Sequence, residues 1–522
     1  MSNGSSGKVM NRWWVVVGAL LIQLCLGAIY AWSAFTGKLT ALPPKAAEVV
    51  AAVPAAGEEV KSEGPLETVA GAVGAVVEGV GEALTGAEEP AKATTAAQGK
   101  AAAPKPVYYE FSKTQTQVIF SVGLATFAVV MAFVAGRWQK TAGPRVVAIT
   151  GGLVLGIGYL IGGLSGTNFW GILIGIGLLG GAGIGLAYVC PIAALVKWFP
   201  DKKGMITGLA VAGFGFGALI WVKLTSGFIF GGVNLLGDWK GLYGMGWSVN
   251  DVWLLYGAIF AVVVFIGSLL TVNPPEGWLP AGWHPTTAGA KATGGVDYTA
   301  AQMGRTFQFW TLFLTFTAGA LAGLMVIGVI KLFGKEALVG NGMDSAKAIV
   351  VADTAMGVFY ALMNGMGRII WGTVSDKIGR KNAIVLMSAS QGVMMLAFYY
   401  VGGHQWGLYI GAAIIGFNFG GNFALFPAAT ADLFGNKNVG TNYPWVFMAY
   451  GVGGLIGPIL GGVMGDNQAW LWAFIPAGIA CLLVAGLSAT LKPLPVRVHG
   501  EEPVQEEAIA KDGAWPHRHP KS

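Results

Sequence analysis

The chain has 522 residues, of which 54% are hydrophobic and only 11% are charged. Soluble domains carry roughly a quarter charged residues, so this chain lacks the polar side chains needed to cover a water-facing surface. The net charge is +6, but the lysines and arginines lie in short clusters between apolar runs, which indicates membrane topology and no nucleic-acid partner. The long apolar runs exclude disorder and a collagen-like fibre as reasons for the 82 glycines.

Apolar runs long enough to cross a bilayer core, about 20 residues each, recur along the whole chain. They predict an all-α membrane protein with twelve transmembrane helices in two six-helix halves. The predicted helices lie near residues 13–36, 114–135, 146–164, 169–198, 205–228, 251–272, 306–332, 350–374, 383–402, 406–434, 440–465 and 468–491. The first of them is too long for a secretory signal, so we interpret it as a retained anchor.

The basic clusters predict the orientation of these helices. Lysines and arginines gather in the loops at 137–145, 202–203 and 377–381, whereas the opposite short loop at 165–168 has no charge. Because basic residues accumulate in short cytoplasmic loops, we expect both termini on the cytoplasmic side of the cell membrane.

Two segments between the predicted helices have a different composition from the helices. Residues 37–112 are rich in Ala, Gly, Pro, Glu and Lys, and apolar residues recur at helical spacing over 66–84. This pattern predicts an amphipathic helix on the membrane or over the outer mouth of the helix bundle, but its glycines make a disordered loop equally compatible. The predicted divisions are 1–36, the cytoplasmic N-terminus and helix 1; 37–112, an extracellular insert; 113–272, helices 2 to 6; 273–305, a cytoplasmic linker; 306–491, the second six-helix bundle; and 492–522, a cytoplasmic tail.

The two halves share an internal repeat with an offset of 236 residues. Gly136 to Gly143 recurs as Gly372 to Gly379, and three further helical positions recur at the same offset. Those pairs are Gly185 with Gly421, Pro191 with Pro427, and Gly215 with Gly451. Six helices after six with one topology form a parallel repeat, which is typical of transporters that rock two halves about a central site.

Several short motifs resemble those of one transporter family. Ser375 to Lys381, preceded by Gly372, is similar to the loop motif of the major facilitator superfamily. Together with six other motifs, this loop resembles the oxalate/formate antiporter family, whose members are microbial relatives of the monocarboxylate transporters. The six motifs are Asn11-Arg12-Trp13, Gly27 to Trp32, Lys197 to Gly204, Asn364 to Arg368, Ala424 to Pro427 and Asn442-Tyr443. The resemblance covers the chain except 37–112 and the tails.

The resemblance implies a secondary transporter of a small organic anion, with Gly372, Asp376, Gly379 and Arg380 as a conformational latch. Three positions depart from the family pattern. Lys140 replaces the Asp of the first-half loop, and Tyr450 stands where oxalate exchangers of the family have a lysine. Asn364 replaces an Asp that monocarboxylate transporters carry one turn before the helix-8 arginine. These departures favour a monocarboxylate over oxalate and leave open how a proton would be carried.

Arg368 is the main candidate for binding the anion. It stands eight residues before Asp376, about 12 Å above the cytoplasmic end of helix 8, where an unpaired charge is costly. Its planar guanidinium matches a carboxylate in two parallel hydrogen bonds, and no acidic residue is predicted at its depth. Tyr188 and Tyr450 are candidates at the same level. Asn364, Asn418 and Asn422 are candidates for lining the same cavity, and Tyr30 for closing it from outside. Packing explains each aromatic equally well, and interhelical hydrogen bonds explain Asn418 and Asn422 equally well.

Three lysines fall near predicted helix ends instead. Lys223 and Lys331 lie near the outer ends of helices 5 and 7, and Lys197 lies near the inner end of helix 4. Long lysine side chains near a helix end reach water, so we expect all three to extend to the membrane surface.

The sequence predicts a secondary carrier and not an enzyme. Cys25, Cys190 and Cys481 lie in apolar runs away from His, so neither a disulfide framework, a metal site nor a cofactor is expected. There is no ATP-binding loop and no paired acid at membrane depth. The expected substrate is a small monocarboxylate such as lactate, formate, pyruvate or acetate, moved with protons or by exchange. Oxalate/formate exchange is the alternative, followed by an anion channel or a transporter-like sensor.

Overall fold

The computed structural model describes residues 10–41, 108–200, 203–227, 229–230, 233–234, 239–275, 278–280, 297–435, 438–492 and 494. Nearly all of these residues are helical. The helices of the first half are α1 (Arg12–Leu26), η1 (Gly27–Ala31), α2 (Ser33–Leu39), α5 (Lys113–Val130), η2 (Met131–Ala135), α6 (Gly136–Leu164), α7 (Phe169–Ile172), η3 (Leu173–Gly180), α8 (Gly181–Trp198), α9 (Lys203–Ser226), α10 (Gly241–Gly244) and α11 (Val249–Leu270).

The second half follows a short linker. Its helices are α13 (Ala300–Met303), α14 (Phe307–Gly340), α15 (Ser345–Thr354), η4 (Ala355–Tyr360), α16 (Ala361–Ile378), α17 (Arg380–Val401), α18 (Gln405–Phe434), α19 (Val439–Asp466) and α20 (Trp470–Ala489). A small hairpin of β1 (Ile229–Phe230) and β2 (Val233–Asn234) follows α9.

Twelve membrane spans are present in the described residues. Eleven continuous helical stretches are long and apolar enough to cross a bilayer, and one of them, Lys113–Leu164, has 52 residues. At about 1.5 Å per residue that stretch would be about 78 Å long, more than twice the bilayer core. It is broken at Gly143, whose φ of 80° lies in the left-handed region, and Pro144 follows. The stretch therefore contains two spans, and the predicted count of twelve is confirmed.

The repeat is visible in the backbone. Gly143 has φ 80° and ψ 162°, and its repeat partner Gly379 has φ 85° and ψ 151°. Both glycines end one span and begin the next, at positions where an L side chain would be strained. The two loops lie 236 residues apart and share one unusual backbone conformation, as the internal repeat of the sequence predicts.

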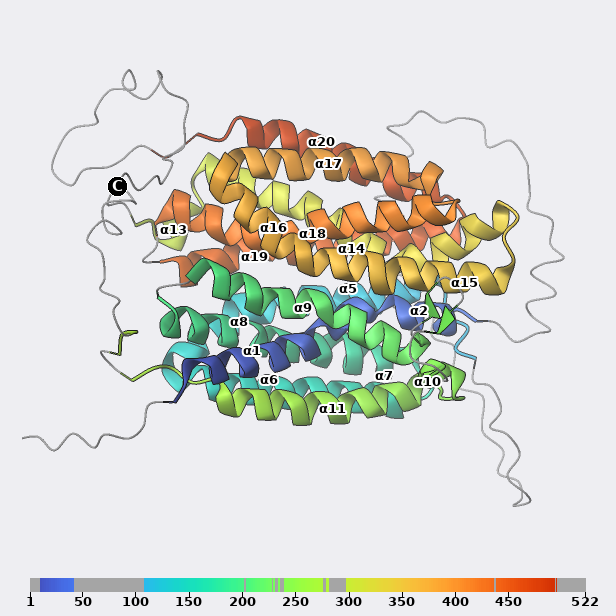
Figure 1. The fold of residues 1–522 in the computed structure, drawn as a ribbon, viewed down its shortest axis with the longest axis horizontal. Helices are drawn as coiled ribbons and strands as arrows, with labels where there is room; N and C mark the ends of the chain where they lie inside the picture. The colour runs from blue at the N-terminus through green and yellow to red at the C-terminus, as the bar shows by residue number, and fades with distance from the viewer. Residues whose placement is uncertain are drawn as a thin grey trace, which may run out of the picture.

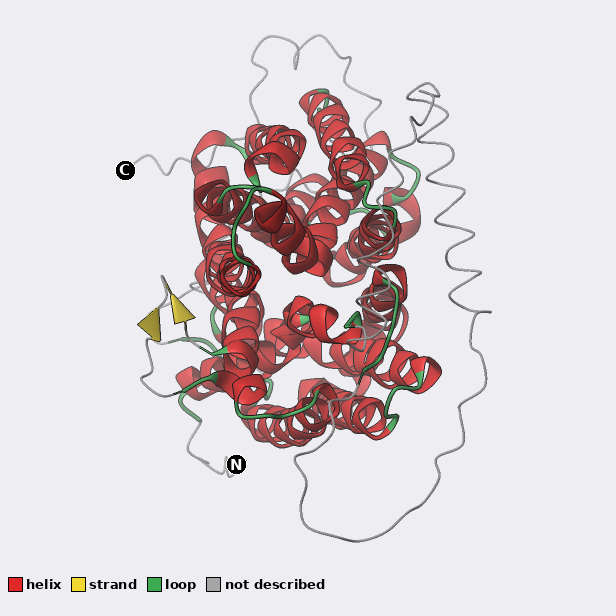
Figure 2. Cartoon of the chain, turned by 90° about the vertical axis from the view of Figure 1, so that its right-hand side faces the viewer, coloured by secondary structure: helices red, strands yellow, loops and turns green. Residues whose placement is uncertain are grey.

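The two halves form two helical bodies that lie side by side. In Figure 1 the helices up to α11 form the lower body and those from α14 to α20 form the upper body. Figure 2 looks along the helices and shows the same two bundles in cross-section. Helices α2, α10 and α15 lie at one end of the molecule, called the α15 end below, and α13 lies at the other, the α13 end. Positive charges in the loops predict that the α15 end is extracellular.

Close packing between the halves depends on small residues. Gly215 of α9 lies so near helix α16 that a Cβ on it would come within 2.9 Å of Gly365 Cα. Its repeat partner Gly451 of α19 faces α5, where a Cβ would come within 2.6 Å of Ala128 Cβ. Lipid provides no hydrophobic force between helices, so such close backbone approach contributes to the packing of the two halves.

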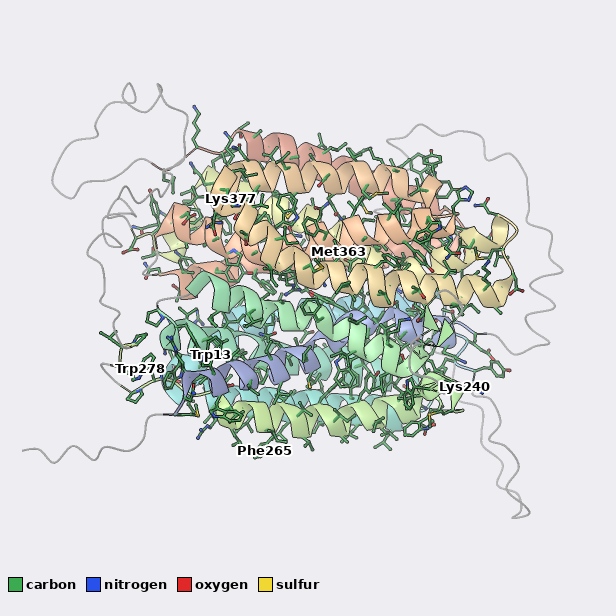
Figure 3. The ribbon with its side chains drawn as sticks, in the orientation of Figure 1. Trp13, Lys240, Phe265, Trp278, Met363 and Lys377 are labelled. Atoms are coloured by element: carbon green, nitrogen blue, oxygen red, sulfur yellow. The ribbon has the colours of Figure 1, made fainter. Side chains whose placement is uncertain are left out.

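The outer surface of the molecule is apolar. Phe265, Val393 and Leu483 expose 43%, 60% and 69% of their surface, although a soluble protein would bury most such residues. Phe265 lies on the outer side of the lower bundle in Figure 3, whereas Lys240 and Lys377 lie toward opposite ends of the helices. The chain is therefore a multi-pass membrane protein with a lipid-facing belt.

The predicted insert 37–112 lies mainly outside the described residues. Helix α2 continues to Leu39, two residues beyond the predicted start of the insert, and description resumes at Tyr108. The amphipathic helix predicted over 66–84 lies outside the described residues.

Candidate substrate site

Arg368 lies in the middle of α16 and is 1% exposed. Its Nη1 donates to the backbone carbonyl of Val211 at 2.9 Å, across the boundary between the halves. Its Nε donates to Asn364 Oδ1 at 3.4 Å, and Nη2 is buried with no hydrogen-bond partner within the described chain. No carboxylate in that part of the chain pairs with this guanidinium. The centre of the protein thus holds a positive charge with spare donor capacity.

Glycines and aromatic rings shape the space around this guanidinium. A Cβ on Gly215 would come within 3.1 Å of Arg368 Nε and within 2.9 Å of Gly365 Cα, so a larger residue there would crowd both the guanidinium and the backbone of α16. The guanidinium carbon lies 4.0 Å from the ring centroid of Phe423 and 5.5 Å from that of Phe214. Cation–π contacts of this kind stabilise a buried cation without neutralising it.

Three of the predicted tyrosines surround the same point. The hydroxyl of Tyr450 donates to the hydroxyl of Tyr30 at 3.2 Å and joins the two halves. The hydroxyls of Tyr30 and Tyr188 are close enough to Arg368 to interact with its charge. All three rings are at most 2% exposed, and Phe127 makes ring contacts with Tyr188 and Tyr450 at 5.1 and 5.5 Å. The structure therefore brings Arg368, Tyr30, Tyr188 and Tyr450 into one layer.

Of the three predicted asparagines, one contacts Arg368 and two form hydrogen bonds elsewhere. Asn364 lies one turn from Arg368 and accepts its Nε hydrogen bond, while its own Nδ2 is buried without a partner in the described chain. Asn418 instead donates to Ser390 Oγ at 3.0 Å, which is the interhelical bond that the sequence left open as an alternative. Asn422 donates to the carbonyl of Phe419 within its own helix. Within the described residues, no hydrogen bond joins Asn418 or Asn422 to the guanidinium.

Comparison with known proteins agrees with this architecture. The sequence matches the Major Facilitator Superfamily over residues 74–352 and 345–519. This chain belongs to that superfamily. Among solved structures it resembles the bacterial homologue of the human lysosomal transporter Spinster, in an inward-facing and unoccupied conformation. That likeness has a TM-score of 0.52 at 14% identity, covers 93% of this chain and 96% of the other, and concerns the fold alone.

Curated relatives of this superfamily transporter share about a quarter of its sequence. The uncharacterized MFS-type transporter YhjX of Escherichia coli is 26% identical over 85% of this chain and 86% of its own. The oxalate:formate antiporter of Oxalobacter formigenes is 26% identical over 69% of this chain and 78% of its own. The apicoplast pyruvate carrier 1 of Toxoplasma gondii is 26% identical over 60% and 63%.

The superfamily loop motif forms an ion-pair cluster at the α13 end. Arg380 pairs with Asp376 at 2.5 Å and with Asp432 of α18 at 3.1 Å, and it also contacts the hydroxyl of Ser375. Gly379 gives the chain the positive φ that directs Arg380 back onto α16. The cluster therefore joins the ends of three helices of the second half, and Gly372 lies one turn before it in an uncrowded position. Its role as a latch stays a prediction.

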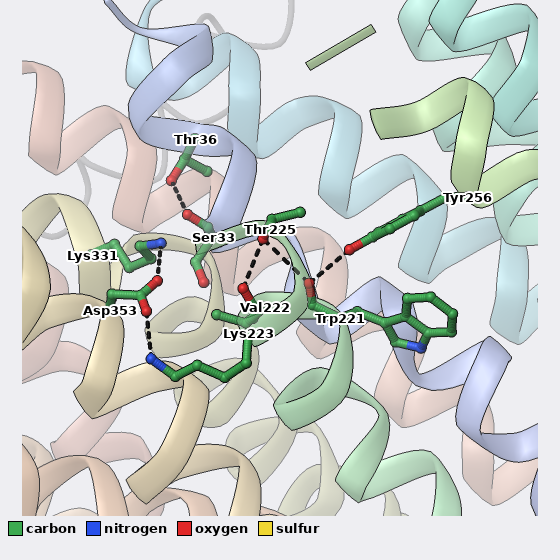
Figure 4. Close-up of polar contacts among 9 residues, drawn as sticks. All are labelled: Ser33, Thr36, Trp221, Val222, Lys223, Thr225, Tyr256, Lys331 and Asp353. Atoms are coloured by element: carbon green, nitrogen blue, oxygen red, sulfur yellow. Dashed lines mark hydrogen bonds and ion pairs between the residues drawn. The ribbon is translucent and has the colours of Figure 1, made fainter. Parts of the chain in front are cut away.

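The prediction that Lys223 reaches water is wrong, because its side chain is 2% exposed, whereas the side chain of Lys331 is 15% exposed. Both bind Asp353 on α15, with Lys223 Nζ 2.6 Å from Oδ2 and Lys331 Nζ 2.6 Å from Oδ1 (Figure 4). Helix α14 continues to Gly340, so Lys331 lies nine residues before the end of the helix. Lys197 does lie exposed and donates to Asn273.

Asp353 was missed by the sequence analysis. The predicted helix 8 began at residue 350 and placed Asp353 in its first turn, whereas the observed span begins at Ser345. An acid more than one turn inside an apolar span is the signal that would have found it.

The α15 end is closed by further polar contacts between the halves. Asp466 at the end of α19 accepts from the backbone amides of Lys113 and Thr114, both at 2.8 Å, and so caps helix α5 of the other half. Lys113 also pairs with Glu336 of α14 at 2.7 Å. The structure therefore represents a conformation in which the two halves are joined at this end.

Proposed function

We propose that this transporter carries a small monocarboxylate across the membrane by alternating access of a site at Arg368. The observation that carries the proposal is the buried guanidinium, whose Nη2 has no hydrogen-bond partner among the described residues. A buried charge without a counter-ion costs several kcal/mol, and a bound carboxylate would remove that cost. A carboxylate also matches the planar donor geometry of arginine.

The charge of the site favours one carboxylate over two. Arg368 is the one cation that the described residues place in this layer, and Tyr450 occupies the position of the second cation that the resemblance expects in oxalate carriers. The hydroxyls of Tyr30 and Tyr188 lie near the guanidinium and would be additional donors to an anion bound there. Lactate, formate, pyruvate and acetate belong to this class, and oxalate/formate exchange is the second candidate, because one relative is named an oxalate:formate antiporter.

Coupling follows from the charge of the substrate. A monocarboxylate moving alone carries negative charge against the membrane potential on uptake, so inward transport needs a proton or an exchanged anion. Asn364 accepts from Arg368 but does not titrate, so a proton travels with the substrate or on another group. Vesicles without internal substrate but with an inward proton gradient separate these modes, because the gradient drives uptake into them only by symport. If the pH gradient fails to drive uptake while preloaded unlabelled lactate accelerates it, the transporter is an exchanger.

The direct test uses uptake of labelled formate, acetate, lactate, pyruvate and oxalate by the purified protein in proteoliposomes. Arg368→Ala should abolish carboxylate uptake, and Arg368→Lys should lower it nearly as far because an ammonium lacks the planar fork. Loss of one charged hydrogen bond corresponds to about 1.5–3 kcal/mol, or about 10- to 150-fold in transport efficiency.

The matched control is Arg145→Ala, which removes an arginine that lies exposed at the end of the bundle and donates to the carbonyl of Leu269. This variant should transport normally. Both variants must elute as folded protein in size-exclusion chromatography. Full transport by Arg368→Ala, or a preference of the wild type for sugars or cations, would remove the proposal. Uptake that never saturates and shows no trans-stimulation would favour a channel.

The proposal includes a location and an orientation. Clusters of lysine and arginine in the loops at the α13 end favour that end as cytoplasmic, with both termini on that side of the cell membrane. Labelling of Lys240, which lies near the α15 end in Figure 3, from outside intact cells tests the orientation.

A further inference from the structure

The cluster of Lys223, Asp353 and Lys331 contains two cations and one carboxylate, and Lys223 and Asp353 are buried at the boundary between the halves. Lys223 is 1% exposed and Asp353 is 6% exposed, and each lysine binds a different oxygen of the carboxylate at 2.6 Å. A carboxylate bound by two lysines leaves one positive charge in excess. Such an arrangement is expensive inside a membrane protein, so it indicates a function and not mere packing.

The three residues of the cluster come from both halves of the protein. Lys223 lies on α9 of the first half, whereas Lys331 and Asp353 lie on α14 and α15 of the second. If the halves separate at the α15 end, Asp353 moves together with Lys331 and keeps that partner. Lys223 then loses its carboxylate and remains on the opposite wall of the opening with its charge unpaired.

The position of Lys223 connects it to Arg368. Both residues lie along the contact between α9 and the helix that runs through α15, η4 and α16 (Figure 4 shows its α15 end). Val211, whose carbonyl accepts from Arg368, is twelve residues before Lys223 on α9, which corresponds to about 18 Å along the helix. Gly357 makes room for the lysine, because a Cβ there would come within 3.0 Å of Lys223 Cε.

We propose that Lys223 is a first binding site for the substrate carboxylate, uncovered when the α15 end opens and reclaimed by Asp353 when it closes. The proposal rests on the proposed function, since it requires rocking halves and an anionic substrate. Asp353 already shows the chemistry of the site, because it presents a carboxylate to the same ammonium. Closure restores the Lys223–Asp353 pair, which displaces the substrate carboxylate from Lys223 and leaves Arg368 as its next cation.

A pair of variants separates substrate binding from mere pairing with Asp353. In Asp353→Asn, Lys223 has no carboxylate partner, so any remaining dependence on Lys223 reflects the substrate. We expect the double variant Asp353→Asn/Lys223→Gln to have a kcat/KM for lactate about 10-fold below that of Asp353→Asn, the loss of one charged hydrogen bond. Asp353→Asn/Lys197→Gln is the control, because Lys197 is exposed at the opposite end, and it should match Asp353→Asn. Equal kcat/KM values for Asp353→Asn and Asp353→Asn/Lys223→Gln would overturn the proposal.

A second measurement does not require Asp353→Asn to fold. Acetylation of Lys223 by an amine-reactive reagent is followed by mass spectrometry in wild type and in Arg368→Ala, with lactate or chloride present. Lactate should slow the acetylation of Lys223 at least about 3-fold in both proteins, whereas chloride should not. An acetylation rate that lactate leaves unchanged would overturn the proposal.

The two proposals fail in distinguishable ways. If Arg368→Ala abolishes uptake but lactate does not protect Lys223, the central site stands and the entry site is wrong. If the wild type takes up no carboxylate and lactate protects no lysine, the proposed function and the entry site are both wrong.

Discussion

Tyr450 offers a test of whether charge matching at the centre sets the substrate class. Its ring is fully buried, contacts Phe447 at 4.9 Å, and directs its hydroxyl to Tyr30 at 3.2 Å. Tyr450→Lys would place a second cation in the layer that contains Arg368. No described carboxylate is available there to neutralise it.

The expected magnitude follows from Coulomb's law. Two unit charges at about 6 Å with an effective dielectric constant of about 20 repel by about 3 kcal/mol. A single carboxylate neutralises one cation and leaves the other unpaired, so transport efficiency for lactate should fall by about 100-fold. Oxalate carries two carboxylates and pairs with both cations, so its uptake should rise.

The assay measures lactate and oxalate uptake side by side in proteoliposomes containing wild type, Tyr450→Lys or Tyr450→Met. Methionine is the neutral control, because it has nearly the length of lysine and reports the loss of the aromatic ring alone. The ratio of oxalate to lactate uptake should rise only in Tyr450→Lys. An unchanged ratio would refute the idea that this position selects between mono- and dicarboxylates, and it would leave the role of Arg368 intact.

Two further predictions concern packing and the loop motif. Gly453→Ala would bring a Cβ within 2.6 Å of the Thr317 carbonyl, so it should lower the free energy of unfolding by about 1–3 kcal/mol. A thermal melt in detergent measures this loss. Gly440→Ala is the control, because its Cβ would meet no atom within 4 Å, and it should leave the melt unchanged. Arg380→Ala breaks two partly exposed ion pairs, which contribute at most about 1 kcal/mol to stability, so it should slow lactate turnover with little change in melting temperature. Lys377→Ala is its control. Normal turnover in Arg380→Ala, with a change only in KM, would contradict a latch.

The twelve spans, the two halves and the candidate Arg368 could be predicted from the sequence because a bilayer imposes simple local rules. Every backbone group in hydrocarbon must be bonded within its own helix, so each span requires about 20 consecutive apolar residues, which are visible without knowing any contact. The repeat of Gly143 at Gly379 has the same local character, since both need a positive φ. A lone arginine twelve ångströms or so inside a helix is rare enough to indicate a site by itself.

The partners of each polar side chain were decided only by the tertiary structure. Lys223 and Lys331 have the spacing of residues that reach water, yet both bind Asp353, because α9 of the first half packs beside α14 and α15 of the second. Asn418 shares a helix face with Asn422 in the sequence, but the neighbouring helix α17 supplies Ser390 as its partner. A hydrogen bond or ion pair depends on positions across two helices to within about an ångström, and hydropathy along one helix contains no information on that distance.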